Sequence, residues 1–452
     1  MPKKFGILFI GVLLGLGLAL ISVETLFPQR TGYPLEEFSQ RRERLMSQVQ
    51  EGVIILFGEP APPSGRHFRQ DNDFFYFTGI EDSNAVVVMV AKTKKSYLFL
   101  PQQTEREALF EGPNLLSDPQ AAKKYGLAAI YPVSYFDEFL ARILPSQGFR
   151  VHLRLQPRDE VDNARWETRI FVGRRNRNHY HDQLSLDNYR IKKLKERYPA
   201  CSFVDITPVI DRMRVIKSKA EIEILRRNGR ISAEAIKQAM LASKPGAYEY
   251  ELEAAAMYVI LKHGARGFAY PPIVGSGPNS CILHYSRNER QMRAGDLVLM
   301  DFGGDLDYMC IDITRTWPVS GQFTPEQREA YQIVLTVLKA CLEFYRPGVT
   351  SQDVQAHVRQ VLKQKGLDSR GLTGGIGHYV GMATHDVGPR GVPLEEGMVF
   401  AIEPDLYYPE KGWGIRIEDT VLITADGCEV LTAGVPKEIE EVEALLAARD
   451  KR

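Results

Sequence analysis

The second half of the sequence repeats one succession of patterns, in which two helical stretches precede two strands. Ser218 opens the first round, and Glu221 completes a capping box that marks a helix start. Thr324 opens the second round in the same way, with Gln327. The other helices are expected over about 248–264 and 351–366, and the strand pairs at 296–302 with 308–319 and at 397–406 with 414–424. The repeat predicts two pseudo-symmetric halves with a cleft between them, where we expect the active site.

The first half of the sequence follows another pattern, because short apolar runs alternate with helical stretches from about residue 35 to 205. This alternation is typical of an α/β domain. The expected strands are 53–57, 74–77, 85–90, 97–100 and 151–155. A chain of 452 residues is long enough for two domains. We therefore predict an α+β protein with a smaller α/β amino-terminal domain, 35–205, and a catalytic domain, 211–440.

The first thirty residues have the features of an export signal. Lys3 and Lys4 precede an uncharged apolar run over 6–23, and Glu24 ends it. As a helix this run would reach roughly 27 Å, about the thickness of a bilayer core. Residues 1–30 are predicted to be a cleaved signal peptide or an uncleaved membrane anchor. Both place the rest of the chain outside the inner membrane, in a periplasmic or other extracytoplasmic position.

Charge and cysteine content exclude several classes of function. The chain has 57 basic residues (Lys and Arg) and 57 acidic residues (Asp and Glu), so its formal net charge is zero. No net positive charge favours binding to nucleic acid or to an anionic membrane surface. The five cysteines are scattered, with no C-x-x-C spacing, which argues against a disulfide scaffold and a cysteine-based metal site. The only membrane contact that we expect is through the amino-terminal segment.

Four acidic residues interrupt the otherwise apolar strands of the repeat: Asp301, Asp312, Glu403 and Glu418. Any one of them could end a strand at the surface. Inside the protein, two carboxylates about 4 Å apart repel by roughly 4 kcal/mol at an effective dielectric constant near 20, so four of them need positive charge. Two divalent cations would balance the charge, and an oxygen-rich ligand set suits manganese.

His378, in the glycine-flanked stretch GGIGHYVGM, is the candidate to complete the ligand set. A pair of divalent ions activates a shared water as a nucleophile at neutral pH, which is hydrolase chemistry. Glu403 is our candidate for the general base that takes the proton of this water and passes it to the leaving nitrogen. Its alternative role is that of a metal ligand alone.

The segments IVGSGPNSCILHYSRN, GDLVLMDFG, DITRTWPVSGQFTPEQ, GHYVGMATHDVG, GMVFAIEP and GIRIED occur in the order and spacing of the aminopeptidase P and prolidase family. In the first half, FSQRRERL, FRQDNDFFYFTGIED and LFEGP resemble the amino-terminal domain of aminopeptidase P. The resemblance covers about residues 35–440 and implies a pita-bread catalytic domain. It also implies a homo-oligomer, either a dimer or a tetramer. The metal-ligand positions of the family fall on Asp301, Asp312, His378, Glu403 and Glu418.

The same resemblance gives roles to three further residues. His284 and His385 fall on substrate-side histidines, which we expect to hydrogen-bond the scissile carbonyl and the oxyanion formed from it. Arg416 matches an active-site arginine that orients an acid or the substrate; its alternative is an ion pair with Asp312 or Glu418. Gly374 departs from the family, which commonly has a histidine four residues before the ligand histidine.

The resemblance implies an enzyme that removes the first residue from peptides with proline in second position. An Xaa-Pro bond has no N–H, so a general peptidase loses a contact there. One alternative is a prolidase that hydrolyses only Xaa-Pro dipeptides. Another is a metal-free pita-bread protein that acts as a binding module.

Overall fold

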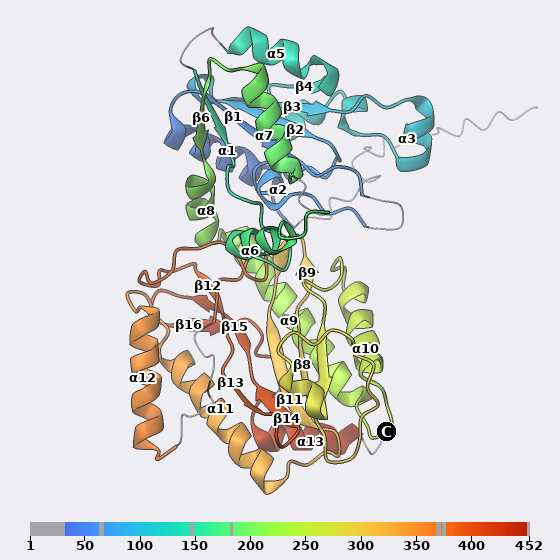
Figure 1. The fold of residues 1–452 in the computed structure, drawn as a ribbon, viewed down its shortest axis with the longest axis vertical. Coiled ribbons are helices and arrows are strands. Elements are labelled where there is room, and N and C mark those ends of the chain that lie inside the picture. Colours follow the sequence, from blue (N-terminus) through green and yellow to red (C-terminus); the bar gives the residue numbers. More distant parts are fainter. Residues whose placement is uncertain are drawn as a thin grey trace, which may run out of the picture.

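The computed structural model describes residues 32–62, 67–144, 149–180, 184–367, 372 and 377–449. Figure 1 shows two parts, the amino-terminal one in blue to green at the top and the repeat-containing one in yellow to red below it. Among the described residues, no helix combines the length and the apolar composition that a membrane span requires. The apolar run 6–23 and Gly374 lie outside the described residues, so the predictions made for them stay predictions.

The amino-terminal part is a six-stranded mixed sheet in the order β4-β3-β2-β1-β5-β6. Its strands are β1 (Val53–Phe57), β2 (Val86–Val90), β3 (Lys95–Leu100), β4 (Ala129–Pro132), β5 (Arg150–Leu153) and β6 (Ser202–Asp205). Its helices are α1 (Leu35–Val49), α2 (Asn72–Thr78), α3 (Glu105–Glu111), α4 (Ala121–Lys124), α5 (Phe136–Ile143), α6 (Arg165–Arg175) and α7 (Leu186–Arg197), with 3-10 turns at Ala91–Thr93, Leu115–Ser117 and Val133–Tyr135. The predicted α/β character of this part is confirmed.

Both faces of this sheet are buried, which explains its continuous apolar strands. Val53 and Ile55 of β1 pack into a core cluster within the amino-terminal part. Ile54 and Leu56 point to the other face and belong to a cluster that continues into the catalytic part. Because one apolar core runs through both parts, the structure offers no sharp limit at 205 or 211, and the predicted domain boundaries stay predictions.

The strand predicted at 74–77 is wrong, because these residues form helix α2. The Asp71 side chain accepts a hydrogen bond from the Phe74 N–H and caps the helix, and Gly79 ends it in the left-handed region at φ 64°. A short apolar run does not distinguish a buried strand from a buried helix. Helix α2 contacts the catalytic part, because Phe75 stacks on Tyr308 with ring centroids 3.5 Å apart.

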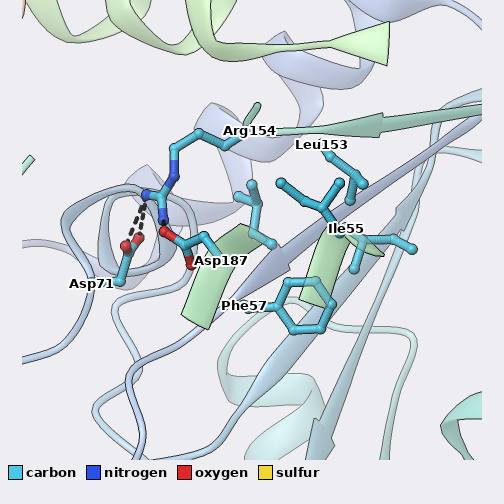
Figure 2. Close-up of a pocket in the computed structure, with 8 residues that line it drawn as sticks. Ile55, Phe57, Asp71, Leu153, Arg154 and Asp187 are labelled. Atoms are coloured by element: carbon cyan, nitrogen blue, oxygen red, sulfur yellow. Dashed lines mark hydrogen bonds and ion pairs between the residues drawn. The ribbon is translucent and has the colours of Figure 1, made fainter. Parts of the chain in front are cut away.

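A buried arginine ties α2 to the sheet and to α7. Arg154, directly after β5, donates to Asp71 at 2.8 Å and to Asp187 at 3.1 Å (Figure 2). The three side chains border a cavity of about 20 Å³ whose apolar wall includes Ile55 and Leu153. That volume is about the space of one water molecule.

The catalytic part shows the predicted repeat. After α8 (Thr207–Val215), the first half contains α9 (Lys219–Ala242), α10 (Glu249–Lys262), β7 (Ile273–Ser276), a 3-10 turn η5 (Gly277–Cys281), β8 (Leu297–Phe302), β9 (Asp305–Leu306), β10 (Met309–Cys310) and β11 (Ile313–Pro318). The second contains α11 (Pro325–Phe344), α12 (Ser351–Gln364), β12 (Val399–Ile402), β13 (Asp405–Tyr408), β14 (Trp413–Arg416), β15 (Asp419–Ile423), β16 (Cys428–Val430) and α13 (Ile439–Arg449). Both predicted capping boxes, at Ser218 and Thr324, are confirmed.

Three of the four strands predicted for the repeat are split in two beside an acidic residue, whereas the strand predicted at 296–302 is the single strand β8. In the first half β8 pairs with β11 and β9 with β10. In the second half β12 pairs with β15 and β13 with β14. Pro404, which has no N–H, breaks the ladder directly after Glu403. These interruptions turn the acid-bearing ends of the inner strands toward one another.

Candidate active site

Asp301 and Asp312 lie on one face of the first hairpin. Asp301 is the last residue but one of β8 and pairs with Thr314 of β11. Asp312 lies two residues before Thr314 and is therefore a diagonal neighbour of Asp301 on the same face. The half-buried hydroxyl of Tyr270 lies within hydrogen-bond distance of both carboxylates and holds them together by sharing its single proton between them.

Glu403 and Glu418 come from the second hairpin. Ile402 pairs with Asp419, so Glu403, just after β12, faces Glu418, just before β15. The Glu418 N–H donates to the Thr314 carbonyl at 3.0 Å, and its carboxylate accepts from the Thr314 hydroxyl at 2.7 Å. Thr314 thus joins the acids of the two halves.

The five predicted ligands come together at this junction. His378 Nε2 lies 3.4 Å from an Asp312 oxygen and 3.7 Å from a Glu403 oxygen. Ligand atoms within 4.8 Å of one another form three overlapping groups: Asp301, Asp312 and Glu418; His378, Glu403 and Glu418; and Asp312, His378 and His385. The geometry brings all five side chains into one cluster.

The shifted pKa values in the cluster indicate that its carboxylates need additional positive charge to be ionised together. Burial and the nearby charges of Asp312 and Asp301 raise the pKa of Glu418 well above its usual value. Burial raises the pKa of Asp301 to about 6, although the charge of Arg416 opposes this shift. Burial by itself would lower the pKa of His378, but the hydrogen bond to Asp312 and the neighbouring carboxylates raise it to about 9.

One carboxylate oxygen shows that the cluster fits metal ions. Glu418 Oε1 is buried and has no hydrogen-bond partner among the described residues. An unpartnered buried oxygen among several carboxylates is costly unless a cation contacts it. A set of four carboxylates and one imidazole, with Oε1 free to coordinate, suits a pair of divalent ions.

Arg416 acts on an acid of the cluster. Its guanidinium forms an ion pair with Asp301 and donates to the Tyr407 hydroxyl at 2.8 Å. The alternative prediction of an ion pair with Asp312 or Glu418 named the wrong partner, because the carboxylate within ion-pair distance of the Arg416 guanidinium is that of Asp301. Arg416 is 4% exposed, so its positive charge lies within the acidic cluster and away from solvent.

A cavity of about 740 Å³ opens beside the cluster. His284, His385, His378 and Glu403 line it, so the predicted substrate-side histidines face the same space. The amino-terminal part closes one side through Ala164, Arg165, Trp166 and Glu167. Figure 1 shows α6, which carries three of these residues, between the two parts of the chain.

Sequence reasoning missed two side chains of this site. Tyr270 is 31 residues from Asp301 along the chain, and Glu167 is 218 residues from its partner His385. The only local signal is the position of Glu167 at the third residue of a helix, which is typical of a capping glutamate and says nothing about His385.

Comparison with known proteins identifies the family. The model of metallopeptidase family M24 matches residues 223–425, and that of the aminopeptidase P N-terminal domain matches residues 38–152. The Xaa-Pro aminopeptidase of Escherichia coli (strain K12) is 36% identical over 92% of this chain and 99% of that protein. This chain belongs to metallopeptidase family M24.

Other relatives agree with this assignment to family M24. The solved structure of E. coli aminopeptidase P with the inhibitor Pro-Leu has a TM-score of 0.78 at 34% identity and covers 93% of this chain and 100% of that chain. A human Xaa-Pro dipeptidase is 29% identical over 92% of this chain and 94% of that protein. The predicted family and the predicted pita-bread fold with an amino-terminal domain are confirmed. As an M24 metallopeptidase the chain is a hydrolase that uses divalent metal ions.

Proposed function

We propose that this M24 metallopeptidase removes the amino-terminal residue from peptides with proline in second position. The observation that carries the proposal is the cluster of Asp301, Asp312, His378, Glu403 and Glu418, of which His378 and Glu403 line the cavity of about 740 Å³. Relatives named Xaa-Pro aminopeptidase reach 36% identity, against 29% for the dipeptidase, which favours the aminopeptidase over the prolidase alternative.

The proposed chemistry divides the work among the side chains of the cavity. When bound, divalent ions supply a polarised carbonyl and an activated water. Glu403 lines the cavity with about a third of its side chain exposed, so its carboxylate can take the proton of the attacking water and deliver it to the proline nitrogen. His284 and His385 face the same cavity and hydrogen-bond the scissile carbonyl and the oxyanion.

We further propose manganese as the working metal, because four of the five ligands are carboxylates. Lys3, Lys4 and the apolar run 6–23 support export to the periplasmic side, with residues 6–23 as a signal peptide or an anchor in the inner membrane. A homo-oligomer, either a dimer or a tetramer, remains our proposal for the assembly.

The test is an assay with Xaa-Pro-Yaa tripeptides and Xaa-Pro dipeptides, with and without manganese. Manganese-dependent release of free Xaa from the tripeptide supports the proposal. Hydrolysis of the dipeptide alone would favour the prolidase. Absence of both activities, with no divalent ion in the purified protein and no rescue by manganese, would contradict an enzymatic role.

A further inference from the structure

Thr384 and His385 of the catalytic part contact the segment around α6, and the next residue, Asp386, binds α8 and the residues after it. The Thr384 N–H donates to the Val161 carbonyl at 2.9 Å. His385 Nδ1 lies 2.7 Å from Glu167 Oε1. Asp386 accepts from Arg214 at 2.6 Å and from Lys217 at 3.0 Å. The loop that carries a substrate-side histidine is therefore fixed against the amino-terminal part of the protein.

Buried ion pairs of the neighbouring Asp386 stabilise this contact. Arg214 is 1% exposed and also binds Asp159, in the segment that leads into α6, at 2.6 Å. Arg165, the first residue of α6, binds both Asp73 and Asp159. These shared partners connect the start of α6 to the Asp386 side chain, and a buried charge that lost its partner would be strongly destabilising.

Both carboxylate oxygens of Glu167 accept a hydrogen bond. Oε2 accepts from the Ala164 N–H at 2.8 Å and caps α6, while Oε1 accepts from His385. Burial opposes ionisation of Glu167, but the hydrogen bond from His385 and the Ala164 N–H keep its pKa below the usual value. A carboxylate can only accept, so His385 Nδ1 carries the shared proton.

This pairing leaves one ring nitrogen of His385 for the reaction. With Nδ1 bound to Glu167, Nε2 is the nitrogen that can face a peptide in the cavity. The ring also contacts His378, with ring centroids 4.0 Å apart. A carboxylate that fixes the tautomer and orientation of a histidine is a recurrent device at catalytic sites.

We propose that Glu167 is a positioning residue that orients His385 toward the substrate, so that the amino-terminal part contributes directly to catalysis. The inference rests on the proposed peptidase function. It assigns Glu167 no contact with the substrate.

Glutamine at position 167 separates positioning from packing. Its side chain has the same shape but a single acceptor oxygen, which cannot serve both the Ala164 N–H and His385 Nδ1–H. If the amide oxygen keeps the Ala164 N–H, the NH2 group faces His385 Nδ1 and can only donate to it, which requires the other tautomer of the ring. Glu107 offers a matched control, because it caps α3 by accepting from the Thr104 N–H at 2.7 Å on an exposed surface.

The kinetic test compares the wild type, Glu167→Gln, Glu107→Gln, His385→Ala and the Glu167→Gln/His385→Ala double variant on Xaa-Pro-Yaa with manganese. We expect Glu167→Gln to lower kcat by about 10- to 100-fold, as substitutions of orienting partners do, with little change in KM. Glu107→Gln should retain wild-type kcat and KM. The double variant should be no slower than His385→Ala, because both substitutions act through one ring.

A kcat for Glu167→Gln within twofold of the wild type would overturn the proposal. So would losses that multiply in the double variant, since a structural role independent of His385 predicts additive free energies. Melting temperatures identify any variant that is simply less stable.

A second readout works even without turnover. In 15N-histidine NMR spectra of the zinc-loaded full chain, His385 should show a protonated Nδ1 in the wild type and in Glu107→Gln, and a changed Nδ1 signal in Glu167→Gln. An identical signal in all three would overturn the positioning role. A wild type that shows the expected signal but cleaves no Xaa-Pro peptide would contradict the proposed function alone.

Discussion

Replacing Glu418 with glutamine should make the metal-free protein more stable. The raised pKa means that the folded state holds Glu418 in its neutral form at pH values where an unfolded chain leaves it ionised. Each pH unit between the ordinary pKa of 4.5 and the raised folded-state pKa costs the folded protein about 1.4 kcal/mol of stability. Glutamine is always neutral and avoids this cost, and its amide can donate to the neighbouring carboxylates.

The sign of the pH dependence follows from the direction of the shift. Below pH 4.5 the Glu418 carboxyl is protonated in both the folded and the unfolded state, so its raised pKa does not change the free energy of unfolding. As pH rises from 4.5 toward the folded-state pKa, the free energy of unfolding of the wild type falls. The difference in melting temperature between Glu418→Gln and the wild type should therefore be near zero at pH 4.5 and larger, in favour of Glu418→Gln, at pH 7. With manganese the wild type should have the higher melting temperature, because only the wild type keeps all five metal ligands. Manganese at 100 times its Kd adds about 2.7 kcal/mol per site to the free energy of unfolding.

Thermal unfolding with a chelator and then with manganese, at pH 5 and pH 7, measures both effects. Glu249→Gln is the matched control, because this buried glutamate already accepts from Ser276, Tyr285 and the Arg290 N–H. Losing an acceptor there should destabilise the protein by about 1–3 kcal/mol, with or without metal. The electrostatic reasoning fails if Glu418→Gln is no more stable than the wild type in chelator at pH 7, or if manganese stabilises both equally.

Three further outcomes follow from the site. Glu403→Gln should lower kcat by about 10²- to 10⁴-fold while circular dichroism stays that of the wild type, and a near-normal rate would remove Glu403 as the base. Tyr270→Phe should weaken manganese binding by about 10- to 100-fold in a calorimetric titration, because its hydroxyl holds both Asp301 and Asp312; unchanged affinity would show that the phenol is dispensable. Manganese affinity should rise between pH 6 and pH 9, since the ion displaces protons from Asp301 (pKa about 6) and His378 (pKa about 9); affinity that is flat or falls over this range would argue against their coordination.

Local signals in the sequence were sufficient for the helices of the repeat. The capping boxes at Ser218 and Thr324 depend on side chains three residues apart, so the pattern contains both partners. The acids also stand out, because charged side chains interrupt strands that are otherwise apolar. The residue types thus allow the cluster to be predicted, whereas its geometry depends on how the two hairpins meet at Thr314.

What the sequence could not supply depends on distant contacts. The run 74–77 is as apolar as a strand, and only the hydrogen bond from Phe74 N–H to Asp71 and the stacking of Phe75 on Tyr308 make it a helix in this fold. Glu167 likewise acquires its role through packing of α6 against a loop 218 residues away. No periodicity or spacing contains such a contact.

Anomalous diffraction at the manganese absorption edge, from crystals grown with manganese, tests the metal centre most directly. Two peaks surrounded by Asp301, Asp312, His378, Glu403 and Glu418, with Glu418 Oε1 as a ligand, are the predicted result. No peak at this position, or carboxylates that turn apart toward solvent, would contradict the account.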